Sequence, residues 1–224
     1  MTPSHVQSVQ VGLPRFHGDA GAADPLDRPW ATGFFKEPVD GPVRVTGTGL
    51  VGDGQSDLVN HGCVDKAVLA YSADHYAGWV AELGLAGLPG GAFGENLTIA
   101  GLTEGDVCVG DVWRSGGVTL EVSQPREPCW KLARRWRIKD LPARVVKSGR
   151  CGWYFRVLVE GAVEAGDACE RLARPNPAWT VQRAHGVMHF AKSDAAASLE
   201  LSAVPGLSVS WREGLRGRAA RASG

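Results

Sequence analysis

The sequence lacks paired cysteines. Its five cysteines stand far apart in 224 residues, with no CxxC pair and no Cys/His series at zinc-site spacing; they are Cys63, Cys108, Cys129, Cys151 and Cys169. The odd count and wide spacing argue against a disulfide framework. The common iron–sulfur spacings are also absent, so we expect the chain to carry no electron-transfer cluster of its own.

Long hydrophobic runs are absent too. No apolar stretch approaches the roughly 18 to 20 residues needed to cross a bilayer, and the first twelve residues lack the basic and apolar segments of a signal peptide. We therefore expect a cytoplasmic protein with no membrane partner. With 44% apolar and 21% charged residues, the composition is that of an ordered protein with a substantial core.

Neither sign of charge is in excess, with 24 basic and 24 acidic residues. Residues 125–150 nevertheless hold nine basic and two acidic side chains. This run predicts either a solvated basic helix face or a local site for an anion. The overall balance, and aromatic residues that are not interleaved with the basic ones, argue against binding to nucleic acid.

Glycine, by contrast, is abundant at 30 residues, about twice its usual share. The glycines separate short β-branched runs, which predict strands at 43–48, 67–71, 96–99, 118–124 and 153–159. In the fourth run, Val118, Leu120 and Val122 alternate with polar residues, as in a half-buried strand. We therefore expect a mainly β fold, a closed or nearly closed barrel with a few packed helices.

Helical periodicity appears in two parts of the chain. Within the barrel, the spacing predicts a helix capped by Ser72 and ending near Gly84, and a short one over 131–137. After Arg174, a Pro-Asn-Pro break precedes three expected helices, capped by Thr180, Asp194 and Ser208. We therefore divide the chain into a barrel domain, residues 1–174, and a three-helix domain, residues 175–224.

Cys129 is the thiol with the most reactive setting. It follows a predicted strand, precedes a predicted helix and has Arg126, Lys131 and Arg134 as near neighbours. A helix N-terminus and nearby cations favour the thiolate, the form that ligates metal or attacks an electrophile. The alternative for any one cysteine is a small buried hydrophobe.

Two clusters of polar residues are embedded in glycine. His61 and Lys66 enter one strand, and Glu95 and Asn96 enter another. Glycine allows a backbone to approach a ligand closely, but each cluster is equally compatible with a tight turn whose side chains are satisfied locally. Neither cluster matches a phosphate loop or a dinucleotide fingerprint.

In combination these segments resemble the MOSC domain, and more closely its YiiM-like branch, over nearly the whole chain. The matching motifs are H-G-x-x-D-K-A at 61–67, F-G-E-N-L at 93–97, G-D at 110–111, V-S-Q-P-R-x-P-C at 122–129 and G-W at 152–153. The resemblance implies a MOSC-type β-barrel related to the C-terminal part of molybdenum cofactor sulfurases. It also implies a small three-helix domain after Arg174.

The resemblance further implies that Cys129 ligates molybdenum held by molybdopterin, a role that suits a soft thiolate. Molybdopterin carries a phosphate, and its expected donors are His61, Lys66, Arg126 and Arg150, with Asn96 as a polar contact. No pyridoxal phosphate, flavin or iron–sulfur cluster is expected in this chain.

One position departs from the family pattern. Where relatives usually read H-G-G, this chain has Cys63. A positive φ there would cost about 1 to 2 kcal/mol. We expect an ordinary backbone conformation at Cys63 rather than a second thiol beside the cofactor.

The implied activity is a molybdenum-dependent reduction of N-hydroxylated compounds, such as hydroxylaminopurines and hydroxylamines. An external flavoprotein or iron–sulfur reductase would then deliver the electrons. The alternative is a carrier of the cofactor, or of sulfur as a Cys129 persulfide, motivated by kinship with the sulfurases. Two roles stay open for the three-helix tail, homodimerisation and closure over the site.

Overall fold

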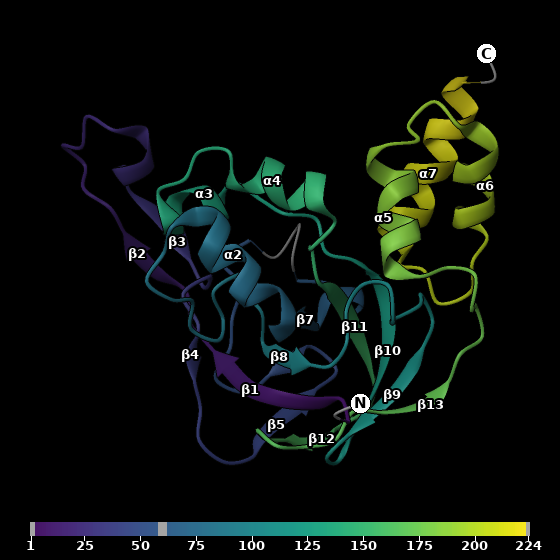
Figure 1. Ribbon diagram of the computed structural model, residues 1–224, viewed down its shortest axis with the longest axis horizontal. Helices are drawn as coiled ribbons and strands as arrows, with labels where there is room; N and C mark the ends of the chain where they lie inside the picture. Colours follow the sequence, from purple (N-terminus) through teal and green to yellow (C-terminus); the bar gives the residue numbers. More distant parts are fainter. Residues whose placement is uncertain (1–2, 58–61, 223–224) are drawn as a thin grey trace.

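The structure, a computed structural model, describes residues 3–57 and 62–222 and is dominated by one curled sheet (Figure 1). Its eight strands run in the order β13-β9-β10-β11-β7-β8-β1-β4, and smaller sheets are formed by β12-β5-β6 and β2-β3. The strands are β1 (His5–Val11), β2 (Arg15–His17), β3 (Trp30–Thr32), β4 (Glu37–Pro38), β5 (Val43–Thr46), β6 (Gly49–Leu50), β7 (Val68–Ser72), β8 (Leu97–Ala100), β9 (Val112–Ser115), β10 (Val118–Pro125), β11 (Trp153–Val159), β12 (Gly161–Val163) and β13 (Glu170–Ala173).

The sheet curls so that β1, at the start of the chain, contacts residues 167 and 168, near the end of the barrel. β1 pairs with β8, while the Val6 amide donates to the Asp167 carbonyl at 2.9 Å and His5 bridges Ala168. The neighbouring pair β7–β8 is parallel and the other strand pairs are antiparallel. The mainly β, barrel-type prediction is confirmed, with a half-barrel as the observed form.

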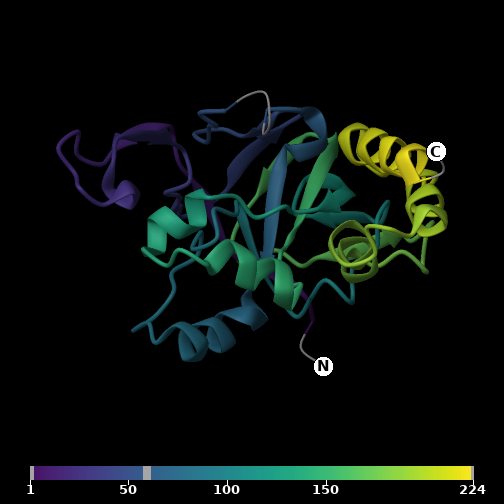
Figure 2. The ribbon, with the colours of Figure 1, turned by 90° about the horizontal axis from the view of Figure 1, so that it is seen from above.

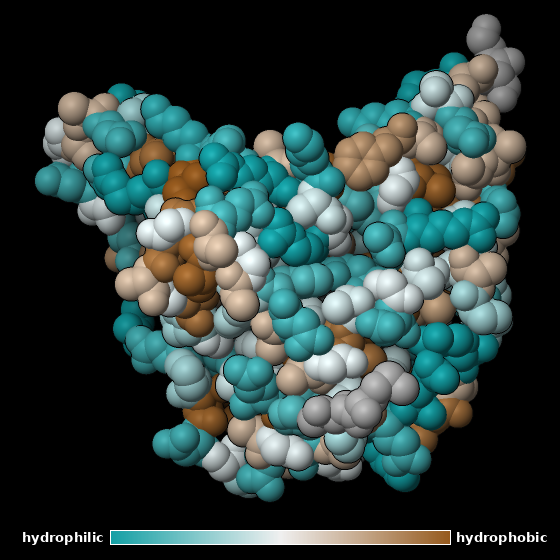
Figure 3. Space-filling view, in the orientation of Figure 1, coloured by the Kyte–Doolittle hydropathy of each residue, from teal (hydrophilic) through white to brown (hydrophobic). Residues whose placement is uncertain are grey.

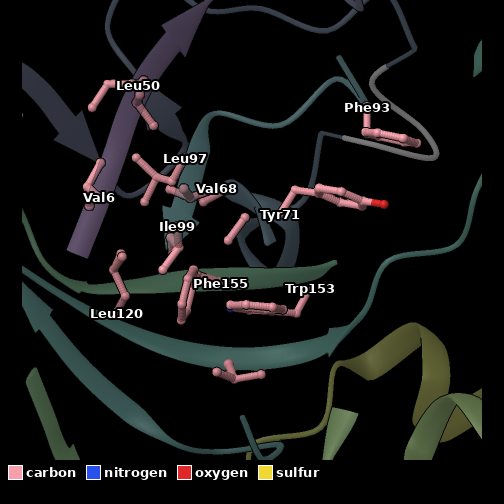
Figure 4. Close-up of a cluster of buried hydrophobic side chains, with 14 of the residues drawn as sticks. Val6, Leu50, Val68, Tyr71, Phe93, Leu97, Ile99, Leu120, Trp153 and Phe155 are labelled. Atoms are coloured by element: carbon pink, nitrogen blue, oxygen red, sulfur yellow. The ribbon is translucent and has the colours of Figure 1, made fainter. Parts of the chain in front are cut away.

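The interior of the curled sheet is filled by large apolar side chains (Figure 4). Val6, Leu97 and Ile99 come from adjacent strands, and Tyr71 stacks on Phe93 with ring centroids 4.3 Å apart. These side chains are at most 2% exposed. Alternation along the strands directs them inward, and the sequence pattern located β5, β7, β8, β10 and β11, whereas β1 and the remaining strands were not predicted.

Short helices lie over the sheet. α2 (Tyr76–Leu83) follows a one-turn helix capped by Ser72 and ends at Gly84, whose φ is 64°, as expected for a C-cap glycine. α3 (Lys131–Trp136) also forms where the sequence predicts it, whereas α4 (Leu141–Ser148) was not predicted. Within the described ranges, none of the helices has the length and hydropathy of a membrane-spanning segment.

The C-terminal helices pack as a unit at one side of the sheet (Figures 1 and 2). α5 (Val181–His189), α6 (Ala195–Ser202) and α7 (Val209–Ala222) begin where Thr180, Asp194 and Ser208 cap them. They share a separate apolar cluster that includes Trp179, Leu201, Trp211 and Leu215. Val109 of the barrel belongs to the same cluster, so the division after Arg174 stays a prediction.

The β2–β3 hairpin projects from the side of the molecule opposite the three-helix unit (Figure 2). Residues of α3 and its C-cap contact the connection between the two strands. Arg134 donates to the carbonyls of Arg28 at 3.0 Å and Pro25 at 2.6 Å, and Arg137 pairs with Asp24 and Asp27. Part of the basic run therefore fastens the hairpin and stays exposed to solvent.

His189 gives the three-helix unit a dependence on pH. Burial, and to a smaller extent the neighbouring His185, Lys192 and Arg218, lowers the pKa of His189 to about 4. Because the unfolded side chain titrates near 6.5, the stability it contributes is fully present above about pH 6.5 and is lost as the pH falls toward 4. The ring is only partly buried, so we expect a loss of about 1 to 2 kcal/mol.

Urea unfolding of the wild type and of His189→Gln at pH 7 and pH 4.5 measures this loss. The variant should lose less stability than the wild type between the two values, because it has no proton to bind there. Equal losses in the two proteins would contradict the assignment.

Candidate functional site

Segments from distant parts of the sequence meet in one pocket at the end of β10. Its wall is formed by Gly33, Phe34, Lys36, Asp53, Gly54, Gln55, Ser56, Lys66, Leu69, Gly94, Asn96, Arg126, Glu127, Cys129, Lys131 and Tyr154. The pocket holds about 580 Å³, part of which is open solvent. The molecular surface is hollowed between the hairpin projection and the three-helix unit, with hydrophobic groups exposed on both (Figure 3).

Cys129 lies in this pocket, half-buried, between the end of β10 and the start of α3. The loop that carries it is anchored at both ends. The Arg126 amide donates to the Gly152 carbonyl at 3.0 Å, and the Cys129 carbonyl accepts from the Leu132 amide at 3.2 Å. The thiol is thus presented by a fixed loop to a cavity rather than packed in the core, unlike the buried Cys108 and Cys151.

Arg126 supplies an unusual donor to the pocket. The residue is 3% exposed, and its Nη2 donates to the Phe93 carbonyl at 3.0 Å. Its Nη1 is buried with no hydrogen-bond partner in the part of the chain that the structure describes. A buried charged donor without an acceptor is costly, so this atom indicates a place for an anion.

Further charged groups make the pocket cationic. Lys36, Lys66 and Lys131 line it together with Arg126, against the carboxylates of Asp53 and Glu127. Lys36 forms an ion pair with Asp53. Burial lowers the pKa of Lys36, and the attraction of Asp53 opposes this shift. The surplus of cations, in a partly enclosed site, suits a ligand that carries more than one negative charge.

Asn96 also lines the pocket, but its amide is engaged in holding the wall. Its Oδ1 accepts from the Leu69 amide at 3.1 Å, and its Nδ2 donates to Asp53 Oδ2 at 2.9 Å. Asp53 in turn accepts from the Gly12 amide at 2.9 Å. These contacts make Asn96 and Asp53 the link between strands β7 and β8 and the segment that carries Lys36.

Tyr154 places a neutral hydroxyl-bearing ring on the same wall. Burial raises the pKa of Tyr154 to about 12, and the nearby Arg126 works in the opposite direction. The phenol therefore keeps its proton at neutral pH and can serve as a hydrogen-bond donor.

The structure brings together four of the predicted site residues, namely Lys66, Asn96, Arg126 and Cys129. It does not bring Arg150 to the pocket. The Arg150 guanidinium lies 3.6 Å from the centroid of the Trp79 ring, and its Nη2 contacts Glu82 Oε2 at 2.5 Å. His61 lies outside the described residues.

Sequence reasoning missed Lys36, Asp53 and Tyr154. Lys36 and Asp53 come from segments whose only sequence signals are glycines and prolines, and nothing local indicates that they meet Cys129. The expected ordinary backbone at Cys63 is confirmed, since its φ is −91° and its ψ is 156°, an extended conformation.

The fold and the pocket together define a class: a curled β-barrel with one thiol in a cationic pocket, followed by a three-helix unit. Comparison with known proteins agrees. The MOSC domain family matches residues 57–170, and the YiiM-like, 3-alpha helix domain matches residues 179–221. The chain therefore belongs to the MOSC domain family, with a YiiM-like three-helix domain.

Relatives extend over most of the chain. The YflK protein of Bacillus subtilis (strain 168) is 44% identical over 181 residues, 81% of each chain. A protein of Gibberella moniliformis named "Reductase" is 39% identical over 155 residues, 66% of this chain and 27% of that protein. The crystal structure of YiiM from Geobacillus stearothermophilus superposes with a TM-score of 0.80 at 34% identity, covering 97% of this chain and all of the other.

Proposed function

We propose that the pocket binds the molybdenum cofactor and that the protein reduces N-hydroxylated compounds, such as hydroxylaminopurines and hydroxylamines. One observation carries the proposal, the Cys129 thiol in the same pocket as the unpartnered Nη1 of Arg126. A soft sulfur ligand suits a metal already bound by sulfur, and a buried guanidinium suits a phosphate. Membership in the MOSC family supports the choice of cofactor.

The residues present fit this group on three counts. Cys129 is half-buried and faces a cavity, as a single protein ligand would be. The pocket has four cationic side chains against two carboxylates, an imbalance that a phosphate monoester would offset. The unpartnered Arg126 donor would gain an acceptor.

When bound, the cofactor supplies a metal centre able to exchange two electrons. The chain's own residues would bind and orient the reactants: Cys129 Sγ as a metal ligand, and Arg126 and Lys66 as donors to the phosphate. Conversion of an N-hydroxylated amine to the amine breaks the N–O bond. It consumes two electrons and two protons and releases water.

The electrons would come from a separate flavoprotein or iron–sulfur reductase. The Gibberella relative supports this part of the proposal, because its name states a reductase and the matched segment is 27% of a much longer chain. We further propose that the protein acts in the cytoplasm, where reducing conditions keep Cys129 available as a ligand.

Metal and pterin analysis tests the proposal. Protein from a host that makes the cofactor and is supplied with molybdate should contain close to one molybdenum and one pterin per chain. Cys129→Ala should lose most of the metal, while Cys63→Ser, a matched thiol variant on an exposed residue, should keep it. A Cys129→Ala protein that retained full metal content and full reductase activity would contradict the proposal.

The second candidate is a carrier of sulfur or of cofactor, in which Cys129 holds a persulfide. The same half-buried thiol in a cationic pocket motivates it. Intact-mass analysis distinguishes the two, because one extra sulfur atom on Cys129 in place of metal supports the carrier. Such a protein would also show no turnover of N-hydroxylated substrates with a reductase partner.

A further inference from the structure

The carboxylate of Asp65 joins three parts of the molecule. Its Oδ1 accepts from Nε and Nη2 of Arg156 on β11, at 2.9 and 2.6 Å. Its Oδ2 accepts at 3.0 Å from the amide of Val209, the first residue of α7. The residue is 7% exposed. One side chain thus links the sheet and the three-helix unit at a point next to Lys66 in the pocket.

The backbone of Asp65 belongs to the same connection. Its carbonyl accepts from the Ser123 hydroxyl at 2.5 Å, and the Ser123 carbonyl accepts from the Ser208 amide at 2.9 Å. Ser123 lies on β10, the strand that leads to Arg126 and Cys129. The first turn of α7 is therefore bonded to both chain segments that bring Lys66 and Cys129 to the pocket.

We infer that Asp65 is a positioning residue through which the first amide of α7 sets the place of Lys66 beside Cys129. The three-helix unit is then part of the construction of the pocket, although it adds no side chain to the lining. The inference concerns the pocket of the proposed function and deepens it, but its test needs neither cofactor nor substrate.

Another buried carboxylate shows what a purely structural role looks like. Asp111 accepts from Arg174 Nε and Nη2, at 2.9 and 2.6 Å, and from the Cys108 amide at 2.9 Å. Like Asp65, Asp111 is a buried carboxylate that pairs with one arginine and accepts from a backbone amide, although the arginine nitrogens contact both of its oxygens. Neither Asp111 nor its neighbours line the pocket, so its contacts serve only to hold the fold.

Val209→Pro removes the donor with little other change. Proline is well tolerated at the first position of a helix and lacks only the amide hydrogen, and Val209 is 61% exposed. Ala195→Pro is the matched control, a proline at the first position of α6. Ser123→Ala removes the hydroxyl that donates to the Asp65 carbonyl and leaves the charge unchanged. Lys66→Gln shows the full effect of losing the pocket cation.

The measurement is the rate of Cys129 alkylation by anionic iodoacetate divided by the rate with neutral iodoacetamide. Both reactions are carried out on the cofactor-free full chain and followed by mass spectrometry of its peptides, so that alkylation of Cys63 is counted separately from alkylation of Cys129. The ratio reports positive potential at Cys129, whereas general loosening accelerates both reagents alike. Lys66→Gln should lower it about threefold.

Val209→Pro and Ser123→Ala should lower the ratio toward the value of Lys66→Gln, while Ala195→Pro should keep the wild-type value. Wild-type ratios in both Val209→Pro and Ser123→Ala would overturn the inference, as would an unchanged ratio in Lys66→Gln. Because the cofactor is absent, this result is independent of whether the protein later proves to bind molybdenum.

Discussion

Arg126→Met should abolish most cofactor retention while leaving the fold intact. The substitution removes the buried guanidinium whose Nη1 has no partner among the described residues, and methionine approximates its length without its charge. Loss of a charge-assisted contact between a buried guanidinium and a phosphate costs about 2 to 5 kcal/mol, so pterin content should fall at least about tenfold.

The free energy of unfolding of the cofactor-free protein should change by no more than about 1 kcal/mol. The Phe93 carbonyl loses its donor, but the fold no longer has to bury an incompletely paired charge. Pterin fluorescence and urea unfolding of the same preparations measure the two effects. Arg15→Met, which changes an exposed arginine outside the pocket lining, is the control. A large loss of stability with normal pterin content would show that Arg126 is structural.

Glu95→Ala should unfold the protein or destabilise it by more than about 4 kcal/mol. The carboxylate is fully buried and accepts from the amides of Gly91 and Phe93, at 2.8 and 2.9 Å, from Thr98 Oγ1 at 3.1 Å and from the Tyr76 hydroxyl. Truncation leaves these donors without an acceptor and creates a cavity, and both effects are among the largest that single substitutions produce.

Glu95→Gln tests the same point with less change of volume. The glutamine side chain replaces one accepting oxygen by an NH2 group, which then faces the N–H and O–H donors around it. We therefore expect the free energy of unfolding to fall by about 2 to 4 kcal/mol. The exposed Glu37→Gln should stay within about 0.5 kcal/mol of the wild type. Urea unfolding measures all three variants. A Glu95→Gln protein as stable as the wild type would show that the buried donors find other acceptors.

The sequence predicts those elements of the fold whose signals lie within a few neighbouring residues. Alternation located the strand at Val118–Pro125, and the cap at Thr180 located α5, because each pattern lies within a few residues. Helix α4 has eight residues and a proline at its second position, and its buried Leu141 and Val145 form only one i, i+4 pair, too short a pattern to be noticed. The strands β2 and β3 were also not predicted, because three residues are too few to show an alternating pattern.

The residues of the candidate site likewise fall into those that a local motif predicts and those that only the tertiary fold brings together. The residues found from motifs are close to one another in sequence or lie in glycine-rich turns, as Arg126 and Cys129 do. Arg150 was expected in the pocket because it ends the basic run. The C-cap of α4 at Gly149, with φ 73°, redirects the chain there, and the guanidinium lies on Trp79. The pairing of Lys36 with Asp53 depends on the tertiary fold.

The route of β1 has a consequence for how the chain folds. This strand, at the start of the sequence, pairs with β8 and closes against residues 166–168. Contacts between such distant residues must overcome a large loss of chain entropy before they add stability, so folding should be slow for a chain of this size. On the ribosome, β1 has only the two-residue strand β4 as a partner until β8 has been synthesised, and its contacts with residues 166–168 form last. Until then its unpaired edge is open to pairing with other chains, so the first strand needs protection during synthesis.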